Sequence, residues 1–113
     1  MAAFEIPSLR FSGNANTALA RRRFLMATND DGFVYATPAE YTVGVSMNNP
    51  AINEVVEVAD GIVMVEAGDV LTVGMQIQVG SDGKAAPYDA GIVVGTALTA
   101  AGASGELATI KLH

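Results

Sequence analysis

The amino-acid sequence predicts an all-β fold, a small compact barrel or sandwich of short antiparallel strands, with an extended N-terminal arm. Short segments of alternating apolar residues recur roughly every 8–12 residues and are separated by turn residues, a pattern typical of such folds. The clearest of them covers residues 71–79, in which apolar residues occupy every second position, so that one face of a strand would lie in a core. The chain has 113 residues and no cysteine, which is enough for one domain without disulfides.

Residues 1–28 are predicted to form an N-terminal arm that docks on a partner, and residues 29–113 are predicted to form the β domain. The apolar residues of the arm are spaced irregularly around Pro7, and the polar segment 12–16 follows them. This pattern fits an extended arm that becomes ordered on binding, or an ordinary edge strand with a loop. Residues 17–26 fit either a short helix or a strand, and the sequence does not decide between them.

Beyond the arm, the sequence indicates strands joined by tight turns. Residues 29–32 and 81–84 contain the Asn, Asp and Gly that turns favour, and Asp60-Gly61 is typical of a hairpin between two short strands. The segment 99–106 is too rich in Gly and Ala for a packed helix. The predicted strands cover residues 33–37, 41–47, 53–58, 61–65, 71–79, 92–98 and 107–112.

The charges are unevenly distributed, with a basic N-terminal segment and an acidic remainder. Residues 1–23 contain four of the six basic residues and one acid, whereas the rest of the chain contains two lysines and eleven acids. The basic residues of this segment are Arg10 and the run Arg21, Arg22 and Arg23. Such an arm is expected to dock on something acidic, and the sequence leaves open whether that is a nucleic acid, an acidic protein surface or a neighbouring copy.

Residues suited to catalysis or to metal binding are few, and none is predicted to form a site. The only histidine is His113, so a Ser–His–Asp triad or a histidine metal site has no basis. The aspartates lie in Gly-containing turns, where they serve the backbone, and no loop has the acid spacing of a calcium site. The glycine-rich segments 91–95 and 102–105 do not match phosphate-binding loops. The sequence therefore predicts a protein that is not an enzyme and that binds no cofactor, metal or small-molecule substrate.

The sequence leaves two alternative functions open. Residues 65–70 and Gly74, followed by Lys84 on a predicted hairpin, look like a biotinyl or lipoyl carrier domain, which presents one lysine at a hairpin tip, although Gly83 and Ala85 depart from both carrier motifs. A carrier or binding module that presents Lys84 on a hairpin is therefore the first alternative. The second is a nucleic-acid-associated β-barrel, but the arginine run has only Phe24 beside it for base stacking, and the body is acidic.

No segment is suited to export or to membrane insertion. Residues 1–11 have no continuous apolar stretch, because Glu5 and Pro7 interrupt it. No run approaches the roughly 20 apolar residues of a transmembrane helix. We therefore expect a soluble protein that is made in the cytoplasm and does not contact a membrane.

Residues 68–112 resemble the small capsid decoration, or cement, proteins of tailed bacteriophages. The matching features are, in order, a turn at Gly68-Asp69, a strand ending in the hairpin Asp82-Gly83-Lys84-Ala85, a strand with Gly95-Thr96-Ala97-Leu98, an Ala/Gly bridge, and a last strand with Gly105-Glu106, Ile110 and Leu112. The resemblance rests on turns and apolar alternation, leaves residues 1–60 uncovered, and carries over no functional residue by motif.

The resemblance implies a structural virion protein that is made in the host cytoplasm, sits outside a phage head and stabilises contacts between major capsid subunits. Its partners would be the major capsid protein and copies of itself in a homotrimer, with no direct contact to nucleic acid. The N-terminal segment of such proteins often reaches to the shell, so deletion of residues 1–12 is expected to leave a folded oligomer that no longer binds heads. The candidate contact residues are Phe4, Ile6, Leu9, Arg10 and Phe11, together with Arg21, Arg22 and Arg23.

Overall fold

The computed structural model describes residues 4–28 and 32–113, and in these residues the secondary structure consists of β-strands and one short 3₁₀ turn. The predicted all-β class is therefore confirmed. The elements are β1 (Ile6–Ala15), β2 (Phe24–Ala27), β3 (Gly32–Tyr35), β4 (Gly44–Ser46), β5 (Val55–Glu66), β6 (Gln76–Val79), η1 (Ser81–Gly83), β7 (Ala85–Pro87), β8 (Gly95–Ala97) and β9 (Leu107–Leu112).

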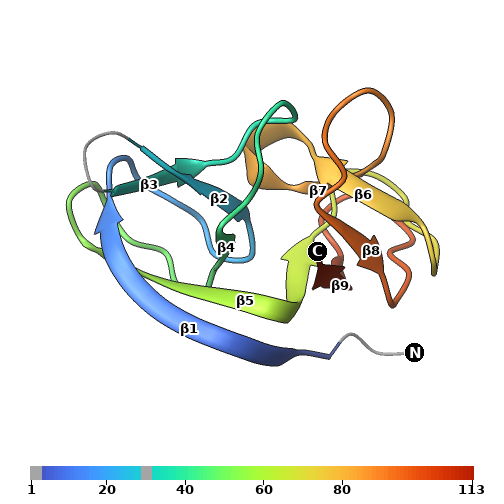
Figure 1. The fold of residues 1–113 in the computed structure, drawn as a ribbon, viewed down its shortest axis with the longest axis horizontal. Helices are drawn as coiled ribbons and strands as arrows, with labels where there is room; N and C mark the ends of the chain where they lie inside the picture. The colour runs from blue at the N-terminus through green and yellow to red at the C-terminus, as the bar shows by residue number, and fades with distance from the viewer. Residues whose placement is uncertain (1–3, 29–31) are drawn as a thin grey trace.

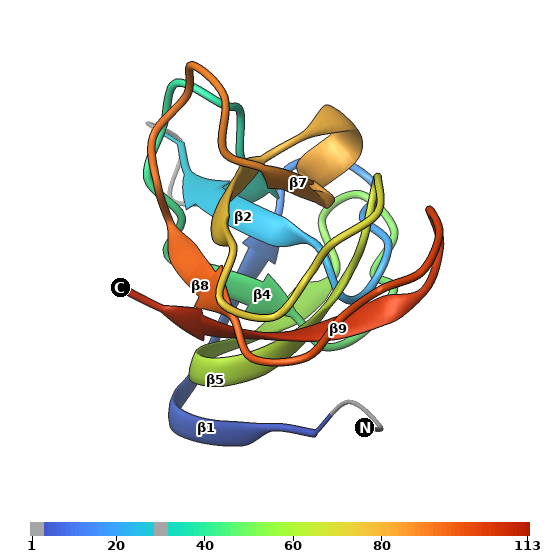
Figure 2. The ribbon, with the colours of Figure 1, turned by 90° about the vertical axis from the view of Figure 1, so that its right-hand side faces the viewer.

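The strands form two lobes that share the long strand β5 (Figure 1). In the first lobe, β1 pairs with β3, β3 with β2, β2 with β4, β4 with β5, and β5 again with β1, so the pairings close into a ring. In the second lobe, β9, β8, β6 and β7 follow β5 in antiparallel order. A parallel bridge between Ala67 and Ala85 leads back to the end of β5. The end-on view shows the strong curl that brings β7 back over the molecule (Figure 2).

Strand β5 passes between two apolar cores and presents a different face to each. The even-numbered Val56 and Val58 belong to the core of the first lobe, and the odd-numbered Ala59 and Val63 belong to the larger core. This change of face is possible within one strand because successive side chains point to opposite sides. The predicted hairpin at Asp60-Gly61 is therefore wrong. In the sequence, the apolar residues shift from even to odd positions next to an Asp-Gly pair, which is the pattern of two strands joined by a turn. In the structure, the chain continues as one strand.

The predicted nine-residue strand over 71–79 is also wrong, because only Gln76–Val79 forms a strand there. Leu71 forms an isolated bridge, and the chain then turns. Gly74 permits this turn because its φ is +85°, a region that residues with a Cβ avoid. Val73, in the turn, is 68% exposed, so the apolar alternation is interrupted at its centre.

Other predicted elements agree more closely with the structure. The last strand has the predicted bounds 107–112, and residues 81–84 form the predicted turn, with positive φ at Asp82 and Gly83. Predicted strands 41–47 and 92–98 are present but shortened to β4 and β8. The predicted turn at 29–32 falls on residues 29–31, which lie outside the described residues.

The described part of the predicted arm is ordered against the chain itself. Residues 6–15 form β1, which pairs antiparallel with β5 from Ile6 to Asn14. This is the edge-strand alternative that the sequence left open. Residues 16–23 form a loop anchored by the buried Leu19, and β2 follows. Whether residues 1–28 act as a separate docking segment stays a prediction.

Candidate functional site

A β-bulge at Ser8 places the apolar residues of β1 on one face. The register pairs Pro7 and Leu9 with consecutive residues of β5, so that Ser8 is an extra residue in β1. In a regular strand, Ile6 and Leu9 would point to opposite faces, because side chains alternate. The bulge turns both to the same face, which explains why the apolar residues are spaced irregularly around Pro7 in the sequence.

Gly61 of β5 makes room for this bulge. Its φ is +110°, and a Cβ built there would lie 2.7 Å from the Ser8 backbone nitrogen and 2.6 Å from its Oγ. Any other residue would be strained in its backbone and would collide with the main chain of β1. Gly61, which in the sequence looks like the glycine of an Asp-Gly hairpin, is therefore needed for the pairing of β1 with β5.

Ile6 and Leu9 belong to an outer surface formed by the three neighbouring strands β1, β5 and β9, of which β1 lies lowest in Figures 1 and 2. Ile6 is paired with Ile62 in β5, and Ile62 with Lys111 in β9. Residues paired directly across neighbouring strands share a face of the sheet. The surface, named here the β1–β5–β9 face, comprises Ile6, Leu9, Asp60, Ile62, Met64, Glu66, Leu107, Thr109 and Lys111, with Phe4 lying over Thr109.

A single threonine hydroxyl fastens the N-terminal segment over β9. The Phe4 amide donates to Thr109 Oγ1 at 2.7 Å, and the same hydroxyl donates to the Phe4 carbonyl oxygen. Thr109 is completely buried, while Phe4 is 37% exposed. The fastening therefore holds the Phe4 backbone beside Thr109 on the β1–β5–β9 face and leaves the Phe4 residue partly open to solvent.

Glu5 provides a second fastening beside the first. Its Oε1 accepts hydrogen bonds from Arg22 Nη1 at 2.5 Å and from the Met64 amide at 3.3 Å. The Arg22 and Glu5 side chains are 18% and 21% exposed, so this ion pair is mostly shielded from water. The chain thus reaches the face on a defined path from Phe4 onward.

The other two predicted contact residues of β1 do not belong to this face. Phe11 is paired with Val58 and contacts the Phe33 ring at a centroid distance of 5.9 Å, inside the first lobe. Arg10 is exposed, but it follows Leu9 and points to the opposite side of the strand. The structure therefore brings Phe4, Ile6 and Leu9 together and separates Arg10 and Phe11 from them.

The run of three arginines does not form one basic patch. Arg21 is exposed, and its side chain forms no ion pair within residues 4–28 and 32–113. Arg22 is paired with Glu5, and Arg23 with Glu66 at 3.3 Å. Two of the three predicted docking arginines are therefore already bound to acids of their own chain.

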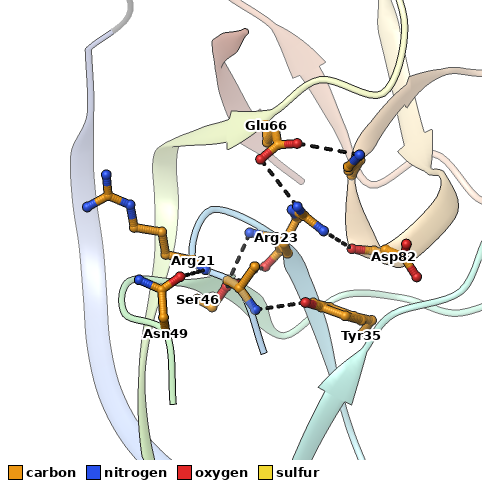
Figure 3. A network of polar contacts seen from close by, with 9 residues as sticks. Arg21, Arg23, Tyr35, Ser46, Asn49, Glu66 and Asp82 are labelled. Atoms are coloured by element: carbon orange, nitrogen blue, oxygen red, sulfur yellow. Dashed lines mark hydrogen bonds and ion pairs between the residues drawn. The ribbon is translucent and has the colours of Figure 1, made fainter. Parts of the chain in front are cut away.

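Arg23 joins the two lobes through a set of polar contacts that we call the Arg23 junction (Figure 3). It lies just before β2, and its Nη1 donates to the Asp82 carbonyl oxygen at 3.0 Å, in the turn before β7. Its guanidinium carbon lies 5.8 Å from the centroid of the Tyr35 ring. Glu66, at the end of β5, binds Arg23 through Oε1 and Lys84 through Oε2 at 3.5 Å. The junction therefore has a structural role, because it links β2 and β3 to β5 and the β6–β7 hairpin.

The geometry gives no support to a carrier lysine at position 84. The hairpin tip is formed by Asp82 and Gly83, and Lys84 follows it with its side chain 27% exposed. Its ammonium group is paired with Glu66. A lysine presented to a modifying enzyme needs a free and extended side chain, whereas this one closes the Arg23 junction.

The edge of β1 is unsuited to adding a strand from another protein. One edge is paired with β5, and the other is paired with β3 only at the C-terminal end, so residues 6–13 have an open edge in the described chain. Pro7 has no N–H, Ser8 forms a bulge and Arg10 carries an exposed charge. These three features commonly protect open edges against strand addition. A partner is therefore expected to contact the face and not the edge.

The described residues also lack a metal site and a membrane-spanning helix. Residues 4–28 and 32–113 contain no group of three or more His, Asp or Glu side chains placed to hold a metal ion. In the same part of the chain, no helix has the length and hydropathy to cross a membrane.

Three large apolar residues of the face were missed by sequence reasoning, namely Ile62, Met64 and Leu107. A strand with one solvated side should carry polar residues at the positions that face water, and large apolar residues at 62 and 64 depart from this rule. That signal is present in the sequence, but the predicted short strand over residues 61–65 after a hairpin does not assign these residues to a surface. Only the strand pairing shows that these residues lie beside Ile6 and Leu9.

Comparisons with known proteins give one matching family and one similar solved structure. A family model described as phage cement protein matches residues 6–112. The chain is also similar to the solved structure of the head fiber gp8.5 N base in bacteriophage phi29, with 23% sequence identity, 93% of each chain covered and a TM-score of 0.78. At this identity the likeness supports the fold. No match is found among curated proteins.

Proposed function

The chain belongs to the phage cement protein family, and from this premise we propose that it binds the outside of a phage head and stabilises contacts between major capsid subunits. The family is one of structural phage proteins associated with the capsid, which makes the chain a virion component. The proposal adds the major capsid protein as partner, the exterior of the head as location and the host cytoplasm as the place of synthesis.

The observation that carries the proposal is the apolar character of the β1–β5–β9 face. Among the described residues, ten large apolar side chains are exposed. Four of them lie on this face, namely Phe4, Ile6, Leu9 and Leu107. Few charges are free there, because Glu66 is paired with Arg23 and Lys84, which leaves Asp60 and Lys111 as the charged residues of the face without an ion pair among the described residues. An apolar centre with few free charges is typical of protein–protein interfaces.

Cementing a shell requires contact and no reaction. Complete burial of one exposed Leu or Ile side chain contributes about 1.5–3 kcal/mol, so the face of a single copy supplies a modest interaction. We propose a homotrimer, as the resemblance implies, because linked copies bring several faces to the shell at once. Their binding is then strengthened by multivalency.

The test is co-sedimentation of the purified protein with empty phage heads, using a double variant of the face. Replacing Ile6→Asp and Leu9→Asp places two charges on the proposed contact surface, and we expect affinity for heads to fall at least about tenfold, or about 1.4 kcal/mol. The matched control is Ile52→Asp, because Ile52 is 60% exposed and Ile6 is 63% exposed, but Ile52 lies in the loop before β5. The control is expected to bind like the unmodified protein.

Native mass and far-UV circular dichroism complete this test. The double variant should keep the fold and the oligomeric state of the unmodified protein, so that lost binding reports on the contact itself. Equal occupancy of heads by the double variant and the unmodified protein would show that this face is not the docking surface. A mass of one chain in solution would contradict the homotrimer and leave the docking face standing.

Deletion of residues 1–12 is a poorer test than the sequence suggested. It would remove most of β1 from its pairing with β5, and it would remove Phe11 from the first core. We therefore expect this deletion to destabilise the first lobe, so that lost head binding would not distinguish docking from folding. The point substitutions avoid this, because Ile6 and Leu9 are mostly exposed.

A further inference from the structure

Two loops on the side of the molecule away from β1 are held together by specific contacts. Loops 36–43 and 88–94 rise side by side at the top of Figures 1 and 2, while β1 lies at the bottom. The Ile92 amide donates to the Pro38 carbonyl oxygen at 2.9 Å. A Cβ on Gly91 would lie 2.6 Å from that same oxygen, so the two loops approach as closely as their backbones allow.

A half-buried side chain of strand β6 supports the second loop. Gln78 of β6 accepts hydrogen bonds at its Oε1 from the amides of Asp89 and Gly91, both at 2.9 Å. One side chain thus fixes two backbone groups of an exposed loop. Loops of this kind are preorganised, and a preorganised loop loses less entropy when it binds a ligand.

A pocket of about 150 Å³ lies at the base of these loops, lined by Tyr41, Thr42, Val93, Val94 and His113. Tyr41 is 73% exposed, and its hydroxyl has no hydrogen-bond partner in the described chain. The His113 ring is fixed because its Nε2 lies 2.9 Å from Thr96 Oγ1. Its other ring nitrogen has no partner among the described residues. The pocket therefore combines apolar walls with two polar groups that are free to bind a ligand.

We propose that this pocket binds one ring of a neutral saccharide. Its volume is well below the roughly 300–1,000 Å³ of pockets for drug-sized ligands, which suits a single sugar ring. The Tyr41 ring and the two valines offer apolar surface to the C–H face of such a ring, and the Tyr41 hydroxyl and the His113 imidazole can bond its hydroxyl groups.

The charge of the two loops excludes anionic ligands from this proposal. Segments 36–43 and 88–94 contain Glu40 and Asp89 and no lysine or arginine, and the whole chain has a formal net charge of −6. Nucleic acids, acidic polysaccharides and anionic lipids would be repelled. A neutral sugar would not be repelled.

The proposal rests on the proposed function for its orientation. If the β1–β5–β9 face lies on the shell, the two loops point away from the head into solvent. Each copy would then present one weak saccharide site, and the many copies on one head would bind a surface glycan together. The saccharide would belong to something outside the virion, such as the surface of a cell.

The experiment is a titration of the full-length protein, followed by heteronuclear NMR, with methyl glucoside, methyl galactoside and N-acetylglucosamine as neutral probes. Glucuronate is the anionic probe. We expect saturable shifts at Val93, Val94 and His113 with at least one neutral sugar. Tyr41→Ala should weaken this binding at least tenfold. Tyr88→Ala is the matched control, because Tyr88 is 46% exposed and does not line the pocket, and it should bind unchanged.

Three results would overturn the proposal. They are the absence of saturable shifts with every neutral sugar up to tens of millimolar, equal binding by Tyr41→Ala and the unmodified protein, or stronger binding of glucuronate than of any neutral sugar. The titration uses the free protein without heads, so its failure leaves the proposed docking face intact. Failure of head binding, measured separately by co-sedimentation, would remove the orientation argument and leave the pocket result valid.

Discussion

The β1–β5–β9 face and the Arg23 junction use the predicted docking residues in opposite ways. On the face, Ile6 and Leu9 are more than half exposed and are available to a partner. In the junction, the Arg23 side chain is 13% exposed and is bound to the chain's own Glu66. Consecutive arginines in a sequence can thus form ion pairs within their own chain. The exposed apolar residues that the bulge turns to one face, in contrast, do not contribute to the core. The comparison favours docking by apolar contact over docking by charge.

The largest expected effect comes from Gly61→Ala, which would disrupt the bulge at Ser8 and with it the β1–β5–β9 face. The new Cβ would meet the Ser8 main chain at 2.7 Å, and φ at this position is +110°. Backbone strain of about 1–3 kcal/mol adds to this collision, so we expect a loss of about 3 kcal/mol or more in the free energy of unfolding. Urea denaturation measures it, and head binding should be lost with the register of β1.

Gly74→Ala separates strain from collision in this experiment. Gly74 also has a positive φ, +85°, but no described atom lies within 4 Å of a Cβ built there. Strain alone should cost about 1 kcal/mol. If both variants lost the same stability, Gly61 would not be needed for the close approach of β1, and the bulge would have another cause.

Arg23→Ala tests the other side of the comparison. It removes the charged group that links Glu66, the Asp82 carbonyl and the Tyr35 ring, but Lys84 still partly compensates Glu66. We therefore expect a loss of about 2 kcal/mol, less than for a fully buried ion pair that loses one partner. Thermal unfolding gives the stability, and co-sedimentation with heads at a temperature where the variant is folded should be unchanged. Lost head binding by a folded Arg23→Ala protein would place this arginine in the docking surface.

The sequence predicted the fold class and several turns because those depend on local chemistry. The last strand keeps one pattern of alternating apolar and polar residues along its length, and it was predicted with its correct bounds. The Asp82-Gly83 pair forms the expected turn. Strand β5 was misread because it serves two cores, so its apolar positions change parity at Ala59. No local rule distinguishes that change from a hairpin at Asp60-Gly61.

The candidate site was predicted in part for a related reason. Phe4, Ile6 and Leu9 were identified from their apolar character alone, but their common face depends on the bulge at Ser8, which only the pairing with β5 creates. Arg22 and Arg23 were predicted to dock on a partner because they belong to a basic segment. Their ion pairs with Glu5 and Glu66 were not foreseen, because these acids are far from them in the sequence. Long-range pairing of this kind is not visible in a single sequence.

A smaller effect is expected from Thr109→Val, which loosens the face without changing its apolar surface. The substitution keeps the shape of the side chain but leaves the Phe4 amide and carbonyl without the hydroxyl that binds both. We expect a loss of about 1 kcal/mol and faster hydrogen exchange at the Phe4 amide. Thr109→Ser keeps the hydroxyl and should retain the slow exchange. Equal exchange rates in the two variants would mean that Glu5 alone holds the N-terminal segment.

The smallest expected effect, and the one that sharpens the comparison most, comes from Arg21→Ala. Arg21 is the exposed member of the arginine run, and its contact with Asn49 uses its backbone amide, which the substitution keeps. Stability should change by less than about 0.5 kcal/mol, and head occupancy at physiological salt should stay the same, because an exposed charge mainly affects association rates at low ionic strength. Co-sedimentation at two salt concentrations checks this. If Arg21→Ala lost head binding while Ile6→Asp with Leu9→Asp kept it, charge and not apolar contact would hold the protein on the shell, and the β1–β5–β9 face would need a different partner.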